Sequence, residues 1–280
     1  MAARGFQPVL ARLLADPGLI DELHGDPEAF AARHGTDAEV VDRLRAIDPA
    51  RLRLTAALRQ KKNRWHMREN FPASAALIER LAREDAVFAA AVERAGLFSG
   101  GSVDGFARRL AAFAETLPEE GPTLVLRELI AFELLWREVR ERPAASAVPP
   151  GEPPERASAA LQGEASGAAG PSAPRLAAGI RLARFAIPVA KAHRQITAGL
   201  PPTGIDPEPT CYVLSCDEGL QTRVSRIPPA LHALLSLCDG TMGAREIAER
   251  LGFALSDVER ALRTAREKGF LAAPRQEVRP

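Results

Sequence analysis

Near its C-terminus the chain reads CYVLSCDEGLQTRVSRI at residues 211–227, followed by PPALHALLSLCDGTMGAREIAERLGFALSDVERALRTAREK at 228–268. The first part of this stretch has two strand-like runs, residues 211–216 and 220–227, on either side of the turn Asp217-Glu218-Gly219, which predicts a β-hairpin. Its second part predicts three short helices, over residues 229–238, 244–251 and 256–268. Glycines 240, 252 and 269 follow them, and the third opens with the capping box Ser256-Asp257-Val258-Glu259.

Strands followed by three short helices are typical of a winged-helix-like unit, which raises the question of DNA binding. In that fold the third helix would enter the major groove. Residues 205–280 contain ten basic and eleven acidic side chains, whereas DNA-binding modules usually carry a basic excess. A winged-helix transcriptional regulator therefore stays an alternative and is not our main interpretation.

Upstream of this unit the chain divides into a helical part and a linker. Residues 143–174 contain seven prolines and few large apolar side chains, which predicts a flexible linker. Residues 1–142 show apolar residues at helical spacing throughout, and 124–140 are apolar on nearly every face. Within them the sequence predicts a turn at Asp16-Pro17-Gly18, a short helix that begins at Asp26-Pro27 and ends at Gly35, a helix around Leu52–Leu58, and an amphipathic helical pattern from Leu77 to Gly96. We therefore expect a mainly α protein with a small α+β domain. Its parts are a helical domain at 1–142 (extension 1–60, bundle 61–142), the linker at 143–174 and a winged-helix-like domain at 175–275.

The composition narrows the classes of partner. The 280 residues carry a formal net charge of +1, so the whole chain predicts neither a nucleic-acid partner nor a membrane. The longest uncharged run, Ile227–Cys238, is too short to span a bilayer. Arg4, Arg12 and Asp16 interrupt the first apolar stretch, which argues against a secretion signal. We expect a soluble cytoplasmic protein.

Catalytic motifs are scarce. The five histidines and three cysteines show no metal-ligand spacing, and there is no phosphate loop or nucleophile elbow. Glu128 and Glu133 lie about 140° apart around their helix, so we interpret them as interface or salt-bridge carboxylates. Basic residues 59–68 surround Trp65 with no acid between them. They suit phosphates or an acidic peptide, or simply form a solvated helix end.

Several stretches resemble known families. Residues 174–182 (PRLAAGIRL), 211–214 (CYVL), 234–240 (LLSLCDG) and 244–251 (AREIAERL) resemble the PqqD-like fold, the recognition element that binds leaders of ribosomally made, post-translationally modified peptides. Residues 181–189 (RLARFAIPV) and 207–210 (PEPT) resemble the C-terminal domain of partner subunits of multinuclear non-heme iron-dependent oxidases. Residues 70–72 (NFP), 87–88 (VF) and 126–136 (LRELIAFELLW) resemble the helical domain of the same subunits.

The resemblance implies an accessory subunit with no catalytic residues, metal or cofactor of its own, which forms a heterodimer with the iron oxidase and holds a ribosomal precursor peptide for it. The leader would add a strand to the hairpin edge. The peptide-binding residues would be Arg223, Val224, Ser225, Arg226, Val258, Leu262 and Arg263. The enzyme-docking residues would be Arg64, Trp65, Arg68, Glu128, Glu133 and Trp136. A stand-alone scaffold, or an enzyme with an unrecognised site, is the third alternative.

Overall fold

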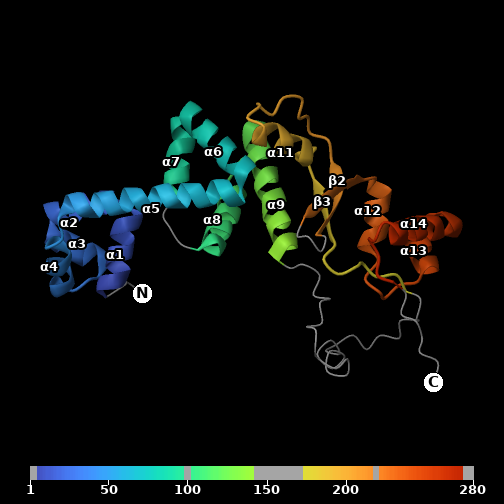
Figure 1. Ribbon diagram of the computed structural model, residues 1–280, viewed down its shortest axis with the longest axis horizontal. Coiled ribbons are helices and arrows are strands. Elements are labelled where there is room, and N and C mark those ends of the chain that lie inside the picture. Colours follow the sequence, from blue (N-terminus) through green and yellow to red (C-terminus); the bar gives the residue numbers. More distant parts are fainter. Residues whose placement is uncertain (1–4, 98–101, 142–172, 217–220, 274–280) are drawn as a thin grey trace, which may run out of the picture. The chain divides into compact units, whose positions relative to one another are not determined.

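The computed structural model describes residues 5–97, 102–141, 173–216 and 221–273, which are mainly helical with a small three-stranded antiparallel sheet near the C-terminus (Figure 1). Two compact units divide the chain. The first comprises Met1–Leu134 and His193–Pro202, and the second comprises Leu135–Ala192 and Thr203–Pro280. Each is described by itself below. Within the described residues, no helix is long and apolar enough to cross a membrane.

The first unit begins with four short helices, α1 (Phe6–Ala15), α2 (Gly18–Gly25), α3 (Pro27–His34) and α4 (Ala38–Arg45). Their apolar faces share one core that includes Leu13, Leu23 and Phe30. The predicted start of α3 is confirmed, because the Asp26 carboxylate accepts the Ala29 N–H at 3.0 Å. Helix α2 was not predicted: the expected turn after Asp16 leads directly into it.

Helix α5 (Pro49–Asn70) is the long helix of this unit (Figure 1) and packs against α1, α2, α6 and α8. The sequence predicted a helix around Leu52–Leu58, and the observed helix continues twelve residues past Leu58 to Asn70. The boundary drawn between residues 60 and 61 therefore falls inside one continuous helix. Leu52 belongs to the core of the four preceding helices, so α5 is part of both sides of that boundary.

The rest of the first unit contains α6 (Pro72–Glu84), α7 (Ala86–Arg94), α8 (Val103–Glu115) and the N-terminal part of α9 (Gly121–Glu141). The apolar pattern from Leu77 to Gly96 predicted no break, but in the structure α6 ends at Glu84 and α7 begins at Ala86, with Asp85 between them. The Asp85 carboxylate accepts the N–H groups of Val87 and Phe88 at 2.8 and 3.2 Å, which caps α7. The predicted apolar helix at 124–140 is confirmed as α9.

The sheet of the second unit consists of β1 (Arg181–Phe185), β2 (Thr210–Cys216) and β3 (Thr222–Ile227), in the order β1-β2-β3. The predicted hairpin is confirmed: β2 and β3 pair antiparallel from Cys211–Ile227 to Cys216–Thr222. Its predicted turn lies outside the described residues. Strand β1 and helix α11 (Val189–Thr197), which precedes β2, were not predicted as elements.

Three helices follow β3, as predicted: α12 (Pro229–Ser236), α13 (Ala244–Leu251) and α14 (Leu255–Glu267). The expected capping box at Ser256 is wrong, because α14 begins at Leu255 and the side chain of its N-cap, Ala254, makes no capping hydrogen bond. At α13 the carboxylate of Glu246 instead accepts the Gly243 N–H at 2.7 Å. The predicted linker, residues 143–174, lies outside the described residues except for its last two.

The apolar faces of these three helices meet one face of the sheet. Cys211, Val213 and Ile227 from the strands share a core with residues of all three helices. The segment before β1 closes this core, since the Leu176 N–H donates to the Cys238 carbonyl and the Ala177 N–H to the Phe270 carbonyl. This core anchors β2, the central strand of the sheet, which pairs with the edge strand β3.

Candidate functional site

Strand β3 is one of the two edge strands of the sheet, and it is far more exposed than its neighbour. Residues 210–214 of β2 are all buried, whereas Arg223, Ser225 and Arg226 of β3 are exposed. The cause is in the sequence, because β3 carries two arginines and a serine where β2 carries Cys-Tyr-Val-Leu. A strand paired on one side only leaves a row of backbone N–H and C=O groups for another strand to pair with.

The predicted peptide-binding residues of β3 point to alternate faces of the sheet. Ser225 pairs with Val213, which lies in the core beneath the helices, so Ser225 and Arg223 lie on the helix side. Val224 pairs with Leu214 and Arg226 with Tyr212, so these two lie on the opposite face. A strand bound along β3 would therefore meet an arginine on each side of the sheet.

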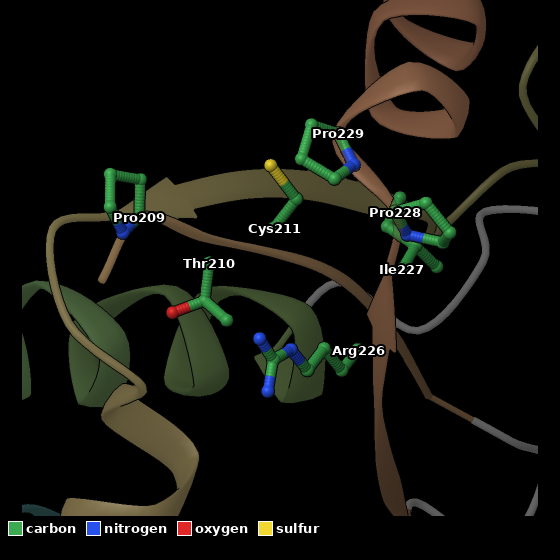
Figure 2. Close-up of a pocket in the computed structure, with 7 residues that line it drawn as sticks. All are labelled: Pro209, Thr210, Cys211, Arg226, Ile227, Pro228 and Pro229. Carbon is green, nitrogen blue, oxygen red and sulfur yellow. The ribbon is translucent and has the colours of Figure 1, made fainter.

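A pocket of about 320 Å³ lies where β2 begins and β3 ends. Its lining residues are Pro209, Thr210, Cys211, Arg226, Ile227, Pro228 and Pro229. Figure 2 shows Thr210 and Arg226 on one side of the sheet and Cys211 pointing to the other, toward Pro229. The three prolines have fixed φ angles and lack an N–H, so this part of the pocket wall is stiff and donates no backbone hydrogen bond.

Charge in the pocket comes from Arg226. Its guanidinium donates to the carboxylate of Glu208 at 2.6 Å, and both side chains are well exposed. The buried Thr210 hydroxyl donates to the Ile187 carbonyl at 2.7 Å and so fixes the start of β2. Because the Arg226–Glu208 pair is solvent-exposed, it is weak. A carboxylate entering the pocket can compete for the same guanidinium.

Two of the predicted helix residues do not reach this surface. Val258 and Leu262 of α14 are 1 % and 3 % exposed and belong to the core of the second unit. Both side chains are buried because they lie on the single apolar face that α14 turns inward, which corrects their assignment to a peptide-binding surface. Arg263 is exposed. Of the three α14 residues, only Arg263 offers its side chain to a ligand at the surface of the described structure.

The predicted enzyme-docking residues are divided between surface and interior. Arg64 and Trp65 are exposed on α5, and Trp65 keeps 56 % of its surface. Arg68 donates two hydrogen bonds to the Glu79 carboxylate, both at 2.9 Å. Glu128 and Trp136 are half-buried on α9, in the first and second unit respectively. Trp65 is therefore the exposed apolar side chain among the predicted contacts.

The structure corrects the assignment of Glu133 to enzyme docking, because this side chain is only 3 % exposed and has partners in the interior. Its two carboxylate oxygens accept the N–H groups of Ala73 and Ser74 at 2.9 and 3.0 Å. His193 Nε2 lies 3.2 Å from the first of these oxygens, and its ring meets Phe132 edge-on. The carboxylate thus caps the N-terminus of α6 from another helix. It is a structural residue and offers no docking surface.

The surroundings shift the pKa of one cysteine thiol and of one histidine in the second unit. Burial raises the pKa of the Cys238 thiol to about 11, so this group is protonated at neutral pH and donates to the Leu234 carbonyl at 3.3 Å. Burial, with a smaller contribution from Arg184, lowers the pKa of His232. Among the described residues no group of three or more His, Cys, Asp or Glu could hold a metal ion.

No family model matches the sequence, and no curated protein matches it either.

Proposed function

We propose that this chain is a non-catalytic partner subunit that binds the leader of a ribosomal precursor peptide and presents the peptide to a multinuclear non-heme iron-dependent oxidase. The proposal takes the hairpin with α12, α13 and α14 as a winged-helix-like peptide-recognition domain. The helical part would dock the oxidase. The iron, and the oxidation of the peptide, would belong to the partner enzyme.

The observation that carries this proposal is the exposed edge strand β3 on a rigid core. An extended peptide that pairs with β3 gains main-chain hydrogen bonds, while its alternate side chains reach different surfaces. Arg223 on one face and Arg226 on the other suit a leader with acidic side chains. The pocket beside Arg226 lies at the end of the same strand and offers a place for one anchoring side chain.

A regulator that binds DNA is supported less well by the same surface. Arg260 on the outer side of α14 forms an ion pair with Asp257 at 2.9 Å, and acidic side chains balance the basic ones in this part of the sequence. Phosphate neutralisation dominates the affinity of DNA-binding modules, so a balanced surface disfavours it. The choice between peptide and DNA is open to direct measurement.

The test is a charge reversal on β3. We expect Arg223→Glu/Arg226→Glu to weaken binding of a fluorescein-labelled leader by about tenfold or more, because two cations facing an acidic strand become anions. The leader is synthesised from the precursor peptide encoded beside this chain's gene, and binding is measured by fluorescence anisotropy. Arg260→Glu is the control, since it reverses one exposed arginine on α14.

The outcomes separate the two functions. Normal leader binding by Arg260→Glu together with weak binding by the β3 variant supports peptide recognition along the edge. If wild-type protein does not bind the leader, and instead retains duplex DNA with a steep salt dependence that Arg260→Glu abolishes, the chain is a regulator and the proposal is wrong.

A further inference from the structure

Helix α5 is apolar on two opposite faces, and only one of them is buried. Leu52, Ala56 and Met67 face the core of the first unit. Leu54, Leu58 and Trp65 lie on the other side, within about 40° of one another around the helix axis. Surface helices normally place polar side chains opposite their buried face. The pattern on α5 is therefore one that folding of this unit does not explain.

The second apolar face is open to solvent. Leu54, Leu58 and Trp65 are 62 %, 59 % and 56 % exposed, and they make up half of the large apolar side chains exposed in the described part of the chain. Single exposed apolar residues are common, but a row of three on one helix face is typical of an interaction surface. We call this row, with the flanking Arg51, Lys61 and Lys62, the α5 stripe.

The charge around the stripe is of one sign. Helix α5 carries seven basic side chains and a single acidic one, Glu69. Arg53 is paired with Asp21 and Arg68 with Glu79, while the basic side chains of the stripe are exposed and make no ion pair with another described residue. A partner that covers the apolar row must therefore bring acidic side chains to its margins.

Three other occupants fit the stripe poorly. A second copy of this chain would place two positive faces together. A nucleic acid would bind the cations but leave Leu54 and Leu58, which lie between Arg51 and Lys61 along the helix, against a phosphate backbone. A membrane-surface helix sinks a wide apolar face into the headgroup region, whereas this row is one side chain wide on a helix that packs against α1, α2, α6 and α8.

We propose that the α5 stripe is the docking surface for an acidic, apolar-faced helix of the oxidase, with Leu58 and Trp65 as its central anchors. This inference rests on the proposed function, because it takes the oxidase as the partner. Apolar anchors that recur along one helix face are how an amphipathic helix recognises its partner. Tryptophan is among the residues that carry most binding energy in protein interfaces.

The test compares binding of the purified oxidase to full-length variants by biolayer interferometry. Leu58→Ser/Trp65→Ser removes the anchors, and Lys61→Glu/Lys62→Glu reverses the margin. Val87→Ser is the control, since Val87 is 75 % exposed on α7 of the same unit. Because all these side chains are exposed, we expect unchanged helix content by circular dichroism for each variant.

We expect each α5 variant to bind the oxidase about tenfold or more weakly, and Val87→Ser to bind like wild type. The loss of oxidase affinity in Lys61→Glu/Lys62→Glu should become smaller as the salt concentration is raised. Leader binding should be normal in all of them, which separates this surface from β3.

Two results would show that the inference is wrong while the proposed function still holds. One is normal oxidase binding by both α5 variants. The other is wild-type retention on phosphatidylserine-containing vesicles or duplex DNA that both α5 variants lose while still binding the oxidase. If wild-type protein does not bind the oxidase at all, the proposed function itself is wrong, and the docking assignment falls with it.

Discussion

At the scale of single residues, Glu133 has the role that sequence reasoning could least foresee. Its spacing from Glu128 indicated that the two carboxylates diverge, and they were assigned to an interface or to salt bridges. The partners of Glu133 are backbone N–H groups 59 and 60 positions away. No local pattern marks such a pair. The only sequence signal is a charged residue inside an unusually apolar helix, which indicates burial but not the partner.

The role of Glu133 gives a direct stability prediction. Glu133→Gln should lower the free energy of unfolding by about 1–3 kcal/mol, because the new amide points an N–H at a backbone donor and leaves it unsatisfied in the interior. Urea denaturation followed by circular dichroism measures the change. Glu84→Gln is the control, since Glu84 is exposed and lies 3.9 Å from Arg80, and its loss should cost about 0.5 kcal/mol or less. Equal effects of the two changes would refute a capping role for Glu133.

At the scale of elements, the sequence predicted most helices and the hairpin, and it failed where tertiary contacts decide. Asp26-Pro27 and Gly35 marked the ends of α3 correctly, because capping is a local interaction. Strand β1 was missed, since residues 181–185 contain two arginines and lack the alternation of a half-buried strand. Val258 and Leu262 were assigned to peptide binding, although an apolar pair at helical spacing is the ordinary sequence signature of a core.

The observed cap of α13 and the cap that the sequence predicted at Ser256 can be compared by mutation. Glu246→Ala should destabilise this unit by about 0.5–1 kcal/mol, because the Glu246 carboxylate accepts the Gly243 N–H at the start of α13. Ser256→Ala should change the free energy of unfolding by no more than about 0.3 kcal/mol, since Ser256 lies inside α14 and its side chain caps no helix. Urea-dependent exposure of the buried Cys211 and Cys238 thiols to a chromogenic disulfide reagent reports this unit. If Ser256→Ala lost more stability than Glu246→Ala, the capping box predicted at Ser256 would be right after all.

At the scale of the whole molecule, the chain separates two surfaces with different chemistry. The α5 stripe belongs to the first unit and strand β3 to the second. The net charge of +1 hides this arrangement, because the strongly basic α5 is balanced by acidic residues elsewhere. Composition alone therefore argued against an electrostatic partner, while the position of the charges along one helix argues for one. Only the structure shows that the basic helix is also apolar on its outer face.

The most direct test of the account is co-purification of the tagged chain with the iron oxidase encoded beside its gene, with stoichiometry from light scattering and iron from elemental analysis. We predict a stable complex whose iron belongs to the oxidase, and an iron-free subunit when the chain is purified alone. The Arg223→Glu/Arg226→Glu variant should form the same complex but fail to retain the leader peptide. The absence of a complex, or a folded β3 variant that loses oxidase and leader together, would contradict the account.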